Sequence, residues 1–194
     1  GISNIEGFLE DYAHVISAFI SLYEVTLDEA WLTKANALTQ FTLEHFADKE
    51  SSMFFFTDAN TSLIARKMEV NDNVIPSSNS VMARNLFYLS KYFYNKDYEA
   101  QATQMLANVY DGMEMYGSGY SNWAILLNHM VFGFYEFVVV GGNAETKYAD
   151  LLTRKLPKVL FACSKTESSL SIFQDKPIVE EALIHLCTSG TCFM

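Results

Sequence analysis

The chain has 194 residues, half of them hydrophobic, and this is enough to bury a substantial core as one domain with a small appendage. Its net charge of −10 and pI near 4.8 argue against nucleic acid or an anionic membrane as a partner, because either would need a clustered basic surface. No apolar run approaches the ~20 residues of a membrane span, and residues 1–13 lack the basic and apolar regions of a signal peptide.

The chain opens at Gly1 without an initiator methionine, which indicates a processed or truncated start. Three cysteines, an odd number, suit a reducing cytoplasmic compartment with free thiols. Cys187 and Cys192 are spaced too widely for a thioredoxin active site and lack the second cysteine pair of a zinc ribbon, so we expect them to form a structural thiol pair or a disulfide. Cys163 is expected to be buried in a strand. Neither a metal nor a cofactor is predicted.

The first half of the chain predicts helical hairpins. Apolar residues recur at helical spacing over residues 8–25, and Thr26–Glu29 has the form of a capping box that opens a second helix to about Phe46. Residues 53–56 are aromatic and predict a brief strand or a packed loop. A polar loop over residues 63–79 then turns at Pro76 and leads into a helix over 80–94 that is apolar nearly all round, and is therefore expected to be buried.

In the second half of the chain, the spacing of apolar residues changes from helical to strand-like after two more helices. Asp97 is expected to cap a fourth helix, and residues 121–134 predict a fifth. A strand over 135–140 ends at two glycines, a helix capped by Asn143 runs to about Leu156, and strands follow over 158–163 and 181–187. Residues 1–134 therefore predict stacked helical hairpins, as an open array or a ring, and residues 135–194 a small strand–helix–strand subdomain.

Four motifs follow one another along the chain: Phe8-Leu9-Glu10-Asp11-Tyr12-Ala13, then Arg66, Glu69, Asp72, Ile75-Pro76-Ser77 and Asn79-Ser80, then Tyr135–Gly141, and the closing pair Cys187 and Cys192. Together they resemble the C-terminal part of the spermatogenesis-associated protein 20 family of thioredoxin-domain proteins. The resemblance implies an N-terminal thioredoxin-like domain followed by an (α/α) toroid of the six-hairpin glycosidase type, similar to N-acylglucosamine 2-epimerases. The expected fold class is thus mainly α, a toroid fragment with a small C-terminal α/β appendage.

If the resemblance holds, the chain is the last third of such a protein, without its thioredoxin-like domain and early hairpins. An opened toroid would expose inner-helix surface and could self-associate. Two functions follow as alternatives: a carbohydrate-active hydrolase or epimerase with a small sugar-like ligand, or a non-catalytic binding or regulatory platform beside a redox domain.

Sugar-processing enzymes need two carboxylates facing one cavity. Asp11 and Asp72 are the candidate catalytic pair, with Glu69 beside Asp72 and Glu10 beside Asp11. Alternatively, Glu10 and Asp11 cap a helix and Arg66 pairs with Glu69 or Asp72.

The remaining candidates are substrate-binding residues. Arg66 and Asn79 could bind a hydroxyl or carboxylate. Asn79 could equally cap the buried helix, whereas Ser77, also a candidate, is expected to cap it. Tyr12 and Trp123 could stack on a sugar or belong to the core. His14 and His129 have the pKa range of an acid–base residue, but a lone histidine in an apolar helix is more often structural.

Overall fold

The computed structural model describes residues 6–61, 65–188 and 191–193. Residues 1–5, on which the predicted processed start depends, and residues 63–64 of the predicted loop lie outside the described residues. The elements in chain order are α1 (Leu9–Thr26), α2 (Ala30–His45), α3 (Ser78–Phe93), α4 (Lys96–Met115), the 3-10 turn η1 (Gly117–Tyr120), α5 (Ser121–Val131), β1 (Tyr135–Val140), α6 (Ala144–Leu152), β2 (Val159–Ser164), the 3-10 turn η2 (Ser171–Phe173), β3 (Leu183–Thr188) and β4 (Thr191–Phe193).

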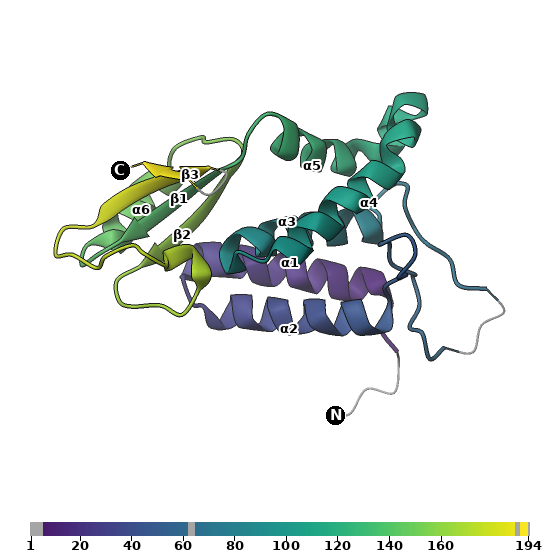
Figure 1. The fold of residues 1–194 in the computed structure, drawn as a ribbon, viewed down its shortest axis with the longest axis horizontal. Helices are drawn as coiled ribbons and strands as arrows, with labels where there is room; N and C mark the ends of the chain where they lie inside the picture. Colours follow the sequence, from purple (N-terminus) through teal and green to yellow (C-terminus); the bar gives the residue numbers. More distant parts are fainter. Residues whose placement is uncertain (1–5, 62–64, 189–190, 194) are drawn as a thin grey trace.

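Two antiparallel hairpins, α1–α2 and α3–α4, form the helical part, as predicted, and α1 lies beside α3 (Figure 1). Asn85 of α3 ties the two helices together, since its Nδ2 donates to the Ala13 carbonyl at 2.7 Å. Leu9, Ile16 and Leu86 are fully buried along this contact. Apolar residues at helical spacing on α1 and α3 thus form part of the main core.

Three of the predicted caps differ in the structure. Asp28 Oδ1 accepts from the Ala30 amide at 2.9 Å, in place of a Thr26–Glu29 capping box. Asn95, not Asp97, caps α4. Asn143 does not cap α6, because its Oδ1 accepts from the Ala182 amide at 2.6 Å and joins α6 to the segment before β3.

The four-stranded sheet has the order β2-β1-β3-β4, with β1 parallel to β2 and antiparallel to β3. The sheet lies beside one end of the helical hairpins, and α6 packs against it (Figure 1). The predicted strand over 135–140 is confirmed, and β4 was not predicted. Cys187 and Cys192 face each other across β3 and β4 and form a disulfide, which is one of the two alternatives predicted for this pair. The disulfide does not agree with the general expectation of free thiols. Cys163 is free and buried, as expected.

The predicted fold class, a mainly α toroid fragment, is wrong. Of the described residues, 53% are helical and 13% lie in strands of a mixed sheet, which makes an α/β arrangement, although the C-terminal strand–helix–strand unit agrees with the prediction. The physical reason is that the sheet is covered on both faces. Val138 and Leu160 point into the main core with the helices, while Val139 and Cys163 pack against α6.

The division of the chain at residue 134 stays a prediction. Among the described residues, no helix is long and apolar enough to cross a membrane.

Candidate functional site

Asp72 is the most heavily bonded of the predicted catalytic residues. Its Oδ1 accepts from the Ser77 amide at 2.9 Å and from the Ser80 hydroxyl at 2.8 Å, and its Oδ2 accepts from the Asn122 amide at 2.7 Å. Ser77 and Ser80 lie at the start of α3 and Asn122 at the start of α5. One half-buried carboxylate therefore satisfies donors at two helix N-termini, where negative charge is favoured.

The neighbouring residues of the loop also support the start of α3. Glu69 Oε2 accepts from the Ser78 amide at 3.1 Å, and the Ser77 hydroxyl is the N-cap, accepting from the Ser80 amide. Asn79 is fully buried and pairs with the backbone of Phe54, donating to its carbonyl at 2.9 Å and accepting from its amide at 2.8 Å. The cap role of Ser77 is confirmed, and Asn79 bonds the aromatic segment rather than facing a cavity.

Arg66 binds carbonyl groups and stacks on an aromatic ring. Its Nε and Nη2 donate to the Thr57 carbonyl, its Nη2 also reaches the His45 carbonyl at 3.3 Å, and its guanidinium lies 4.1 Å above the Phe55 ring. Among the described residues it forms no ion pair with Glu69 or Asp72, so that expectation is wrong. Carbonyls at the C-terminus of α2 attract the cation instead.

The other predicted carboxylate lies on α1, whereas Asp72 lies in the loop before α3. Asp11 is exposed, and its Oδ2 accepts from the Phe8 amide at 2.9 Å, so it caps α1 as one alternative predicted. Glu10 is half-buried in the same turn, and Tyr12 packs against Phe41 and Phe46. Trp123 is fully buried and donates to the Val70 carbonyl, which makes it a core residue.

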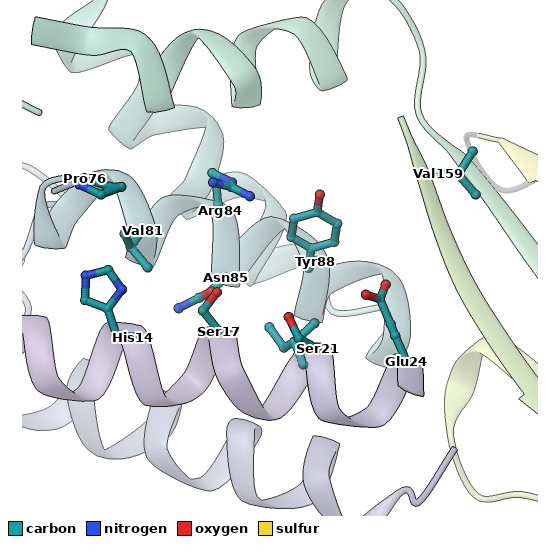
Figure 2. Close-up of a pocket in the computed structure, with 11 residues that line it drawn as sticks. His14, Ser17, Ser21, Glu24, Pro76, Val81, Arg84, Asn85, Tyr88 and Val159 are labelled. Atoms are coloured by element: carbon teal, nitrogen blue, oxygen red, sulfur yellow. The ribbon is translucent and has the colours of Figure 1, made fainter. Parts of the chain in front are cut away.

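A cleft of about 340 Å³ lies between α1 and α3, and none of the eight predicted site residues lines it. Figure 2 shows a row of side chains from each helix, with Val159 of β2 near one end. The lining residues are His14, Ser17, Ile20, Ser21, Glu24, Pro76, Val81, Arg84, Asn85, Tyr88 and Val159. The lining therefore carries seven hydrogen-bonding side chains: two serines, a histidine, a carboxyl, an amide, a guanidinium and a phenol.

Glu24 is the acid–base group of the cleft. Burial raises its pKa to about 6, and a hydrogen bond from the Tyr92 hydroxyl to Oε1 at 3.2 Å partly opposes that rise. The same hydroxyl lies 3.1 Å from the Phe161 carbonyl, and the Tyr148 hydroxyl donates to the Glu24 backbone carbonyl at 2.5 Å. Helix α3, strand β2 and helix α6 thus hold Glu24, whose pKa lies near the range that suits proton transfer at neutral pH.

Arg84 and Tyr88 form the opposite wall, one turn apart on α3. Arg84 Nη1 donates to Asn122 Oδ1 at 2.5 Å, and its Nε is buried without a partner among the described residues. Burial raises the pKa of Tyr88, and the adjacent Arg84 charge opposes that rise. Tyr88 is therefore a neutral hydrogen-bonding group at physiological pH.

Sequence reasoning considered His14 but missed the rest of the cleft. The signal was present on α1, where His14, Ser17, Ser21 and Glu24 recur at intervals of three and four residues and so share one helical face. When the apolar face of a helix packs in the core, its polar face is expected to face solvent, so the polar stripe alone did not indicate a cleft. The facing residues Arg84, Asn85 and Tyr88 lie on α3, and Arg84 is within the first two turns of that helix.

Comparisons with known proteins find relatives of part of the chain. No family model matches. A segment of 94 residues, 47% of the chain, is 36% identical to human spermatogenesis-associated protein 20, and the rat protein of the same name is also 36% identical over 94 residues. An uncharacterised protein of Caenorhabditis elegans, B0495.5, is 24% identical over 160 residues.

These matches span only 12% of each mammalian protein and 22% of the nematode protein. About half of the chain is therefore homologous to spermatogenesis-associated protein 20.

Proposed function

We propose that the cleft between α1 and α3 binds a small hydroxyl-rich ligand of the monosaccharide class. The observation that carries the proposal is the density of hydrogen-bonding side chains on both walls, with Ser17 and Ser21 facing the side that carries Arg84 and Tyr88. Hydroxyl groups of a sugar both donate and accept, so serine, histidine, tyrosine and carboxyl groups in one cleft suit them. The volume of about 340 Å³ lies within the range of small-molecule sites.

The proposal concerns binding first, and catalysis only through Glu24. His14 and Glu24 are ten residues apart on one helix, which separates them by roughly 15 Å along its axis. They are thus too far apart to act as acid and base on the same atom. Glu24 is also the one carboxyl among the lining residues, whereas glycosidases use two.

A non-catalytic binding module is therefore the second candidate, and the single carboxyl is the observation that favours it. The two candidates differ in one measurement. A Glu24→Gln variant that still binds a sugar but no longer turns it over would support the enzyme, and an unmodified sugar in the wild-type reaction would support the module.

The test of binding uses the 194-residue chain and NMR titrations with glucose, mannose, N-acetylglucosamine, glucuronate and glucose 6-phosphate. Amide shifts in α1 and α3 are expected to move with at least one of these sugars. Ser21 is exposed and lines the cleft, so Ser21→Phe is expected to block binding without disturbing the core. Ala18→Phe, exposed on α1 outside the cleft, is the matched control. Shifts that persist in Ser21→Phe, or none with any sugar, would refute the proposal.

A further inference from the structure

Arg84 carries a charge at the cleft wall that its surroundings do not neutralise. Among the residues that the structure describes, no carboxylate forms an ion pair with it. Its Nη1 is bonded to the neutral amide of Asn122, and its buried Nε has no partner within the described part of the chain. Arginine stays protonated in proteins, and a partly buried cation without a counter-ion is costly. This cost is expected to be offset by something that enters the cleft.

The two side chains beside Arg84 offer no negative charge, and the Asp72 carboxylate is linked to Arg84 only through Asn122 and Ser80. Tyr88 is held neutral by burial, which raises its pKa. Burial, and then the Arg84 charge, lower the pKa of His129, so this imidazole is neutral at pH 7. Within the described part of the chain, neither an ion pair nor a hydrogen bond joins Glu24 to Arg84.

Arg84 is nevertheless held in a fixed orientation by a series of hydrogen bonds that runs through Asn122 and Ser80 to Asp72 in the loop before α3. The Asn122 side chain that accepts from Arg84 also donates through Nδ2 to the Ser80 hydroxyl at 2.8 Å. Ser80 in turn donates to Asp72 Oδ1 at 2.8 Å, while Asp72 Oδ2 holds the Asn122 amide. Asp72 is thus a positioning residue that acts on Arg84 through Ser80 and Asn122. The buried Nε does not face the cleft, but Nη2 is not buried and forms no hydrogen bond within the described residues. An oriented guanidinium with this N–H group available is suited to bind the oxygens of an anion.

We propose that the ligand of the α1–α3 cleft carries an oxyanion, a carboxylate or a phosphate, which pairs with the guanidinium of Arg84. This rests on the proposed function and specifies its ligand class as a sugar acid or a sugar phosphate. It also fixes the direction of binding. The anionic group lies at Arg84 and the neutral hydroxyl groups extend toward Ser21 and Glu24, because a second negative charge near Glu24 would be repelled.

The experiment compares glucose with glucuronate, glucose 6-phosphate and inorganic phosphate in calorimetric titrations at fixed ionic strength. The wild-type chain is expected to bind glucuronate or glucose 6-phosphate at least about tenfold more tightly than glucose, since a hydrogen bond to a charged group stabilises by roughly 1.5–3 kcal/mol. The two anionic sugars separate a carboxylate site from a phosphate site. Inorganic phosphate alone is expected to bind weakly and in competition with the preferred sugar.

Arg84→Gln is expected to weaken binding of the anionic sugar at least about tenfold more than it weakens binding of glucose, so that the preference for the anionic sugar is lost. Arg154→Gln removes the same charge from an exposed arginine paired with Asp150 and is expected to change neither. Arg84→Lys preserves the charge should the glutamine variant fold poorly, and is expected to retain part of the preference. Glucose that binds as tightly as its anionic counterparts, or a preference that survives in Arg84→Gln, would overturn the inference while leaving the proposed function intact. Absence of all binding would overturn both.

Discussion

Replacing Asp72 by alanine separates a structural role for this residue from a catalytic one. The substitution removes three accepted hydrogen bonds, from the Ser77 amide, the Ser80 hydroxyl and the Asn122 amide. Loss of one helix cap costs about 1 kcal/mol, with a range of roughly 0.5–2 kcal/mol. Asp72 caps α5 through the Asn122 amide and supports the Ser77 cap of α3 through Ser77 and Ser80, so we expect the free energy of unfolding to fall by about 2–3 kcal/mol.

For a chain of this length, that loss corresponds to a fall in Tm of roughly 4–12 °C. The assay is urea unfolding followed by circular dichroism, with thermal unfolding as a second measurement. Asp72→Asn keeps an acceptor in the same position and is expected to lose less. Asp11→Ala is the control, because the exposed Asp11 carboxylate accepts only from the Phe8 amide in the structure, and its loss is expected to cost about 1 kcal/mol or less.

The reasoning would be refuted if Asp72→Ala unfolded within about 0.5 kcal/mol of the wild type, the usual range of a neutral surface change. A carboxylate that can be removed without cost is not needed to cap α3 and α5. The original prediction of a catalytic Asp72 would then regain support.

Three further outcomes are expected. Burial raises the pKa of Glu24 from 4.5 to about 6, so the contribution of Glu24 to stability is present below pH 4.5 and is lost as the pH rises through 6. In urea unfolding, the free energy of unfolding of Glu24→Gln should therefore gain up to about 2 kcal/mol over that of the wild type between pH 4.5 and 7. A difference that does not change with pH would contradict this. Gly141→Ala should cost about 2 kcal/mol or more, because φ is +131° and a Cβ would lie 2.6 Å from the Ala182 Cα; unchanged thermal unfolding would count against that packing. Reducing the Cys187–Cys192 disulfide should cost at most about 2 kcal/mol, as expected for so short a loop, and should speed amide exchange in β3 and β4 but not in α1.

Local patterns predicted most of the secondary structure. The three-and-four spacing of apolar residues gave α1 to within one residue at each end, and the apolar β-branched run before two glycines gave β1 with its observed bounds. Ser77 after Pro76 was correctly predicted as a cap. These features depend on neighbours within about four residues, so they can be predicted from the sequence without knowing the fold.

The function of the polar loop could not be predicted from local patterns, because it depends on which distant residues the loop contacts. Asp72 and Asn79 have the chemistry of site residues, and only their partners distinguish a site from a support. Those partners are distant in the chain: Asn122 is 50 residues from Asp72, and Phe54 is 25 residues from Asn79.

The sequence by itself determined the helices, the first strand, the acidic surface and the polar stripe on α1. The tertiary structure alone decided that this stripe meets Arg84 and Tyr88 of α3 across a cleft, that Asp72 supports two helix starts, and that the sheet shares its core with the helices. The physical reason is that a helical face is fixed by spacing within one segment, whereas the surface it meets is fixed by packing over the whole chain. Asn85 bonding to Ala13, 72 residues away, is the contact that brings the two walls together.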